Sequence, residues 1–238
     1  MTTNYIKIDD VSSLNFGLFI DRLPRFPAAV KLANYFQVSG RLDSMYQSVD
    51  FYENISVDLT GIIRGFQKED EIIAWISKGK TLFLSNQPDR IGEIRQVTNL
   101  KKERIGSGAL RISWTFVCAP FKISTFNPFY TPVTNPYYFK TRGTIYSEPT
   151  IKVFGATDGC TVTVNGVTLA TDGITGDFYI DVNRRIVYQV VDGENVSVQD
   201  KTSGRFWDML LVPSEDEYNV IEYTNADSVQ YICNERWL

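Results

Sequence analysis

Turn dipeptides at short intervals divide the C-terminal part of the chain into short alternating segments. Asn165-Gly166 separates Thr161–Val164 from Val167–Leu169. Because this pair tolerates the positive φ angles of a tight type I′ turn, it is a strong hairpin signal. In each segment β-branched residues alternate with polar ones, which is the period of a strand with one buried face. The same kind of dipeptide recurs at Asp158-Gly159, Asp172-Gly173 and Asp192-Gly193. The region therefore predicts an all-β sandwich.

The N-terminal part alternates more loosely and carries one helix signal. Ile72, Ile73 and Ile76 follow the helical period within residues 66–78. The acidic run Glu69–Glu71 lies in the first half of this segment, where carboxylates favour the positive end of the helix dipole. Strands are expected over residues 5–20, 33–38, 50–60, 81–84, 92–99 and 110–119. An irregular arm is expected over residues 42–48.

A segment rich in proline and aromatic residues, residues 120–142, follows the last of these strands. It holds four of the nine prolines and seven aromatic residues, whereas a flexible linker would be rich in glycine and serine. Since proline fixes its own φ angle, this connector should be extended, stiff and packed against its neighbours. We expect the domain boundary at its end, with an N-terminal domain over residues 1–142 and a C-terminal domain over residues 143–238.

Charge is distributed unevenly between these two parts. The chain has a formal net charge of −4, with +5 on residues 1–142 and −9 on residues 143–238. A charge of +5 over so many residues is too diffuse for a nucleic-acid footprint, which needs clustered lysines and arginines. The change of sign fits two units with different neighbours.

The residue types that are missing exclude several classes of enzyme. The chain has no histidine and three well-separated cysteines, Cys118, Cys160 and Cys233. Ser-His-Asp triads, HExxH metalloproteases and Cys₂His₂ zinc sites are therefore excluded. The cysteines are expected to be buried small hydrophobic residues in a reducing compartment. No apolar leader and no run of 18 apolar residues is present, so neither a signal peptide nor a membrane span is expected.

One enzymatic interpretation stays open, a glycosidase with two carboxylates across a cleft, since any β-sandwich can place two acids that way. Glu148 and Glu222 are its nominal candidates, although a surface role explains each more simply. The charged stretch KKERIGSG (101–108) is expected to be the tip of a long hairpin that joins the strands over residues 92–99 and 110–119. A phosphate-binding role for it has little support, because the GxxxxGK[ST] pattern is missing. We expect no enzyme, no catalytic residue, no cofactor and no metal.

Three stretches carry a resemblance to a known family. The first is YFQVSGRLDSMYQSVDFYENISVDLTGIIRG (35–65). The second is DEIIAWISKGKTLFLSNQPDRIGEIRQVT (70–98), which is followed by ISWTFVCAPFK (112–122). The third is GTIYSEPTIKVFGATDGCTVTVNG (143–166). In this order and spacing they resemble the distal tail protein (Dit) family of siphophages, and the resemblance spans most of residues 35–238.

The resemblance implies a mainly β chain of two β-sandwich domains. The N-terminal one would bear a single α-helix and an extended arm, and the C-terminal one would be galectin-like. It also implies a structural hub in the phage virion, assembled in the cytoplasm of the bacterial host. Six copies would close into a ring through which DNA passes as cargo. The ring would join the major tail tube protein to a tail-associated lysin or tail fibre, and would carry receptor-binding proteins or their adaptors, with no contact to a membrane.

The arm of such a hub is expected within Arg22–Ser48, a stretch with prolines, apolar residues and no regular period. A closed ring needs a heterologous interface repeated around an axis, and an arm lying on the neighbouring subunit is one way to build it. The alternative is an ordinary loop packed on its own domain. The candidate subunit-interface residues are Leu23, Phe26, Val30, Leu32, Arg41, Met45 and Tyr46.

A carbohydrate-binding module that recognises glycans of the host cell wall is the alternative function. Galectin-like sandwiches are lectin scaffolds, and Trp207, Tyr218 and Tyr223 could supply a stacking platform. Fold does not imply function, however. Galectin-type sugar sites usually include a histidine, and this chain has none.

Overall fold

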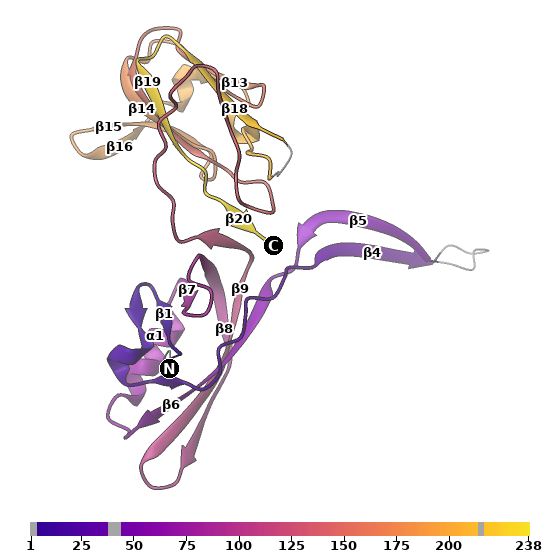
Figure 1. Ribbon diagram of the computed structural model, residues 1–238, viewed down its shortest axis with the longest axis vertical. Helices are drawn as coiled ribbons and strands as arrows, with labels where there is room; N and C mark the ends of the chain where they lie inside the picture. The colour runs from indigo at the N-terminus through magenta and orange to yellow at the C-terminus, as the bar shows by residue number, and fades with distance from the viewer. Residues whose placement is uncertain (1–3, 38–43, 214–216) are drawn as a thin grey trace. The chain divides into compact units, whose positions relative to one another are not determined.

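The structure is a computed structural model that describes residues 4–37, 44–213 and 217–238. Its contacts divide the chain into two compact units (Figure 1): unit 1 holds residues 1–125 with Leu238, and unit 2 holds residues 126–237. The described residues are mainly β, with a single α-helix, which confirms the expected fold class. Within them, no helix has both the length and the apolar character needed to cross a membrane.

Unit 1 is built on an antiparallel sheet whose strands run in the order β2-β1-β7-β8-β9-β6-β3. The helix α1 (Glu69–Lys78) begins three residues later than expected and buries Ile72 and Ile76 in the same core as the sheet. The strands are β1 (Ile6–Ile8), β2 (Val11–Ser12), β3 (Phe19–Ile20), β6 (Ile55–Arg64), β7 (Thr81–Leu84), β8 (Arg90–Ile105) and β9 (Ala109–Ser124), with a 3-10 turn η1 (Ser13–Phe16). As expected, a long hairpin joins β8 to β9.

A second, separate ribbon in unit 1 consists of β4 (Lys31–Gln37) and β5 (Ser44–Tyr52), which pair antiparallel. Figure 1 shows that β5 runs on into β6 after a short break. The expected strand over residues 33–38 is confirmed for its described part. The irregular arm expected over residues 42–48 is wrong from Ser44 onward, because this segment pairs in register with β4 and so becomes a regular strand.

Unit 2 is a sandwich of two five-stranded sheets, in the orders β10-β18-β12-β13-β17 and β16-β15-β14-β11-β19. The first contains β10 (Tyr137–Phe139), β12 (Thr161–Val164), β13 (Val167–Thr171), β17 (Thr202–Ser203) and β18 (Asn219–Thr224). The second contains β11 (Thr150–Ala156), β14 (Gly176–Asp181), β15 (Ile186–Val191), β16 (Glu194–Ser197) and β19 (Ser228–Ile232). Two 3-10 turns, η2 (Gln199–Lys201) and η3 (Phe206–Asp208), and a last short strand, β20 (Arg236–Trp237), complete the chain.

Alternation explains why these segments form a sandwich. Along β12 the buried apolar residues are Val162 and Val164, and along β14 they are Phe178 and Ile180. All four lie in one core. The turn at Asn165-Gly166 has φ angles of 49° and 82°, as a type I′ turn requires. The hairpin that the sequence predicts at this dipeptide is confirmed.

From Phe126 onward, the connector forms part of unit 2, whereas its first residues complete β9. Tyr130 exchanges two backbone hydrogen bonds with Tyr231, at 2.8 and 3.0 Å. Strand β10 pairs with β18 over three residues. Contacts therefore divide the chain after Thr125, whereas the sequence places the boundary after residue 142. The physical reason for the difference is that the connector binds the C-terminal sheets as a strand.

The three cysteines are buried and free. Burial raises the pKa of Cys118 and Cys233 to about 12 and that of Cys160 to about 11. Because the thiolate is the reactive form, we expect none of them to react with a thiol reagent at pH 8 in the folded protein, and all three to react in denaturant. Counting thiols with Ellman's reagent checks this. A thiol that reacts rapidly before unfolding would contradict it.

Candidate assembly surface

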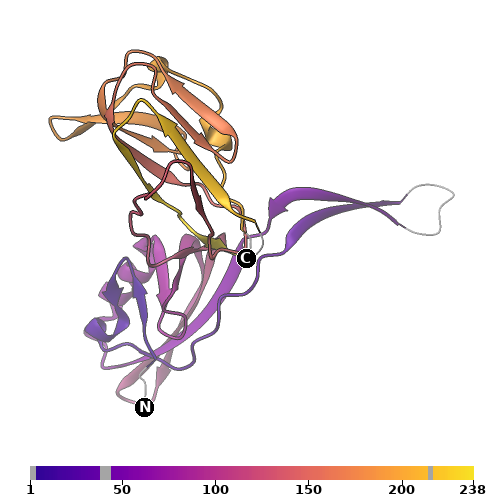
Figure 2. The same cartoon turned by 45° about the horizontal axis from the view of Figure 1, so that its top comes forward.

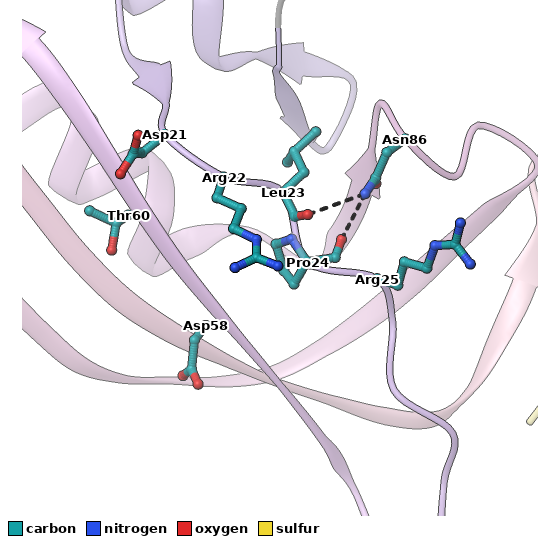
Figure 3. A pocket seen from close by; sticks show the side chains of 8 residues that line it. All are labelled: Asp21, Arg22, Leu23, Pro24, Arg25, Asp58, Thr60 and Asn86. Carbon is teal, nitrogen blue, oxygen red and sulfur yellow. Dashed lines mark hydrogen bonds between the residues drawn. The ribbon is translucent and has the colours of Figure 1, made fainter.

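The segment that leads into the hairpin of β4 and β5 is fastened to the sheet of unit 1. This segment, residues 21–30, is called the strap below. The side-chain amide of Asn86 donates to the backbone carbonyl of Pro24 at 3.0 Å, as Figure 3 shows, and the side-chain carbonyl of Gln87 accepts from the backbone N–H of Phe26 at 2.7 Å. Both amides lie just after β7, so this turn holds the middle of the strap.

Phe26 is the apolar anchor of the strap. Its side chain is only 6% exposed and belongs to the core of unit 1. A Cβ on Gly92 would lie 2.8 Å from the Phe26 ring, so the ring fits because β8 carries a glycine at that point. Leu23 is half-buried against the same core. These two expected interface residues thus pack within their own unit.

Lys122 of β9 holds the strap at Pro27. Its side chain is 2% exposed, and its ammonium group donates to the backbone carbonyl of Pro27 at 3.1 Å. Burial, with a smaller contribution from the positive charge of Arg90, lowers the pKa of Lys122. Burying an ammonium group costs folding free energy unless hydrogen bonds or opposite charges compensate it. The stability of unit 1 should therefore depend on the protonation of Lys122.

We expect Lys122→Met to change how stability depends on pH. The folded-state pKa of Lys122 lies below the value of about 10.4 for an unfolded chain. Between the two values the unfolded chain binds more protons, so this lysine makes the free energy of unfolding rise with pH. The wild type should therefore gain stability relative to Lys122→Met between pH 7 and pH 10. Urea unfolding at several pH values measures this, with the exposed Lys101→Met as the control. Parallel curves for wild type and Lys122→Met would refute it.

An apolar face lies at the root of the hairpin. Val30 is 64% exposed, Leu32 is 38% exposed and Phe51 is 69% exposed. Lys31 is paired with Tyr52, and opposed residues of an antiparallel pair share a face. Val30, Leu32 and Phe51 are the exposed sequence neighbours of this pair, at a point where the register of the hairpin shifts, and they are called the hairpin-root face below.

Two of the remaining candidates lie farther along the hairpin. Met45 and Tyr46 are on β5, in register with Phe36 and Tyr35. Arg41 falls outside the residues that the structure describes. Of the expected interface residues, the structure therefore brings Val30 and Leu32 together at the surface. Phe51 is the residue that sequence reasoning missed, because its alternation with Ile55 suggested one continuous strand, whereas β5 ends at Tyr52 and β6 begins at Ile55.

A polar cavity of about 620 Å³ lies where the strap crosses the sheet. Arg22 and Arg25 come from the strap and Asp58 from β6, as Figure 3 shows, and all three residues are exposed. Asp58 accepts a hydrogen bond from the Thr115 hydroxyl at 2.6 Å. The lining residues are Asp21, Arg22, Leu23, Pro24, Arg25, Asp58, Thr60 and Asn86. Mixed charges of this kind suit contacts to polar side chains of another chain.

The two carboxylates considered for catalysis, and the first acidic residue of α1, have structural surroundings of their own. The carboxylate of Glu148 forms an ion pair with Arg236. Glu222 is exposed on β18, in register with Thr163. Glu69 at the start of α1 binds Lys102. In the described ranges, no group of three His, Cys, Asp or Glu residues is placed to hold a metal ion.

The aromatic residues considered for sugar stacking also have separate surroundings. Trp207 packs edge-on against Phe206, with ring centroids 5.4 Å apart. The ammonium group of Lys140 lies 4.8 Å from the centroid of the Tyr218 ring. Tyr223 is partly buried against the core of unit 2. Each ring thus has a structural contact of its own.

Comparison with solved structures shows which known folds this chain resembles. The chain is similar to the Dit (gp 19.1) protein of phage SPP1, described as a paradigm of the hub adsorption apparatus in phages that infect Gram-positive bacteria. That similarity has a TM-score of 0.74 and 13% identity over 100% of both chains. It is also similar to chains of two phage P2 baseplate structures in the activated conformation. The one with Sr gives a TM-score of 0.55, 9% identity and coverage of 97% of this chain and 96% of the other. The one with Ca gives a TM-score of 0.52 and 8% identity, and the match covers 100% of this chain and 99% of the other.

The sequence matches no protein-family model and no curated protein. The likeness is therefore one of fold, and it extends over the whole of both units. The Dit-like fold that three sequence blocks predict is confirmed.

Proposed function

We propose that this chain is the structural hub of a siphophage tail tip, a distal tail protein whose six copies close into a ring. The observation that carries the proposal is the match in fold to the SPP1 Dit protein along the complete length of both chains. The location that follows is the phage virion, after assembly in the bacterial cytoplasm.

The strap and the hairpin-root face supply what a ring interface needs. A heterologous interface must place a fixed surface of one subunit on a different surface of the next. Phe26, Lys122 and Asn86 fix the strap. The hairpin it leads into therefore starts from a defined position, with Val30 and Phe51 exposed there. An exposed apolar cluster of this kind is typical of a protein–protein contact.

The partners follow from the same role. One side of the ring would bind the tail tube protein and the other a tail-associated lysin or fibre, with receptor-binding proteins or adaptors at the periphery. The hub itself would be non-enzymatic, and DNA would pass through the ring as cargo. The net charge of −9 on residues 143–238 helps to keep that part soluble until partners bind.

Electron microscopy with light-scattering mass tests the ring. The expected result is a sixfold ring with six times the chain mass of 27.1 kDa, about 163 kDa. The variant Phe51→Asp together with Val30→Asp should reduce ring formation at least tenfold, since two charges would be desolvated at the interface. Val133→Asp, at an 86% exposed valine of unit 2, is the matched control and should assemble normally.

Two outcomes would count against the hub. One is a monomer at every concentration that also fails to assemble on purified tail tubes. The other is specific binding of that monomer to cell-wall glycans, which would favour the carbohydrate-binding alternative.

A further inference from the structure

The hairpin of β15 and β16 extends beyond the core of unit 2. Both views show it projecting from the sandwich (Figures 1 and 2). All four residues of β16, Glu194–Ser197, are exposed. Strand β16 is also the last strand of its sheet, next to β15. A strand in this position presents one row of backbone groups to its surroundings.

The register shows which backbone groups face outward. The N–H of Val198 donates to the carbonyl of Val187 at 2.9 Å, so these two residues form a hydrogen-bonded pair. Hydrogen-bonded and non-hydrogen-bonded pairs alternate along an antiparallel ladder, and Tyr188 is opposite Ser197. The N–H and C=O groups of Ser197 and Asn195 therefore point away from β15. Within the described part of the chain, no backbone partner meets them.

The other end strands of the two sheets are shorter or partly paired. Tyr130 of the connector forms a bridge to Tyr231 on the outer edge of β19, and the end strand β10 is three residues long. The remaining end strand, β17, is two residues long. Among the described residues of unit 2, β16 is thus the longest edge left open. Native proteins usually cover or interrupt such an edge, and here it is free.

Apolar side chains accompany the open edge. Val190, Val191 and Val196 are 49%, 49% and 45% exposed. Val191 and Val196 share the face of the ribbon that carries Val187 and Val198, whereas Val190 lies on the other face. An added strand would therefore meet Val196 on one face of β16, and Asn195 and Ser197 on the other.

Charge selects the kind of strand that fits. The hairpin carries the acidic residues Asp192 and Glu194 at its tip and no basic residue between Ile186 and Ser197. Two copies that paired through β16 would offer each other no charge of opposite sign, because the only charged residues of the hairpin are acidic. A strand with lysine or arginine residues would instead be attracted.

From these observations we infer that β16 is a docking edge for an extended, cationic segment of another protein, which adds to the sheet through Asn195 and Ser197. This inference rests on unit 2 alone. The docking edge is a property beyond the proposed ring, and either the docking edge or the ring can be disproved while the other stands.

Hydrogen exchange with a defined probe tests the inference on the full-length chain. The probe is a capped nine-residue peptide in which lysine alternates with valine. It should slow exchange of the Asn195 and Ser197 amides by about tenfold or more at saturation, because both amides become hydrogen-bonded. A peptide N-methylated at the residues that face β16 keeps the charge and loses the hydrogen bonds, and it should give no protection.

Two variants locate the site. Ser197→Pro removes an outward N–H that does not bond to β15, and proline is tolerated at such edge positions. This variant should therefore fold and should no longer bind the lysine-valine peptide. Glu194→Lys keeps every backbone group and should weaken binding by about three- to tenfold, so the test stands even if the proline variant does not fold. Equal binding of the N-methylated peptide or a glutamate-valine peptide, protection elsewhere in the chain, or self-association through β16 would each overturn the inference.

Discussion

Replacing Phe116 with alanine is expected to lower the free energy of unfolding of unit 1 by about 3–5 kcal/mol. Phe116 is fully buried on β9, paired with Val57 of β6 on one side and with Val97 of β8 on the other. Its ring also packs edge-on against Trp114, with centroids 6.1 Å apart. Because structure surrounds the ring on each side, the cavity left by alanine cannot collapse readily.

Hydrogen exchange measured by mass spectrometry of peptides at increasing denaturant concentrations shows whether the loss of unfolding free energy is confined to residues 1–125. The matched control is Phe19→Ala, at a phenylalanine that is 53% exposed, which should change stability by less than about 1 kcal/mol. Peptides from unit 2, which has a core of its own, provide the internal reference. A loss below about 1 kcal/mol for Phe116→Ala would show that β9 does not run through the centre of a packed core.

Replacing Asn219 with leucine is expected to destabilise unit 2 by about 3 kcal/mol, because it removes two hydrogen bonds to Val212 and one to Asn165 at a buried position. Asn219 is fully buried. Its side-chain oxygen accepts from the Val212 N–H at 2.7 Å, and its side-chain nitrogen donates to the Val212 carbonyl at 3.1 Å. The same oxygen accepts from the amide of Asn165 at 2.8 Å. One side chain thus replaces a strand partner for Val212.

The thermal transition of unit 2 measures this effect, and Asn219→Asp refines it. Aspartate keeps the acceptor and loses the donor, so it should also destabilise the unit, since a buried charge has been added. Asn195→Ala, at an exposed asparagine on β16, should shift the transition little. An unchanged transition for Asn219→Leu would mean that Val212 finds other partners.

Sequence reasoning succeeded where the signal is local. The pair Asn165-Gly166 specifies its own turn, and Ile72 and Ile76 mark the buried stripe of α1 without reference to other elements. The long hairpin of β8 and β9 followed from two alternating runs and a charged tip. In each case the information lies within a few residues.

It failed where a residue's environment comes from distant parts of the chain. Phe26 is buried because Gly92, far along the sequence, leaves space for its ring. Lys122 is buried because the strap crosses it at Pro27. The segment from Ser44 is a strand because β4 pairs with it. Neither composition nor period contains these partners, and the hairpin-root face depends on all of them.

The way the connector is bound has a consequence for how genes of this kind can exchange parts. A recombination event at residue 142 would separate β10 from β18 and Tyr130 from Tyr231, and would leave two sheet edges of the transferred sandwich open. A crossover next to Thr125 would transfer the complete set of hydrogen bonds, since the unit begins at Phe126. We expect chimeric chains joined at Thr125 to be soluble and chains joined at residue 142 to aggregate, because uncovered edges pair with one another.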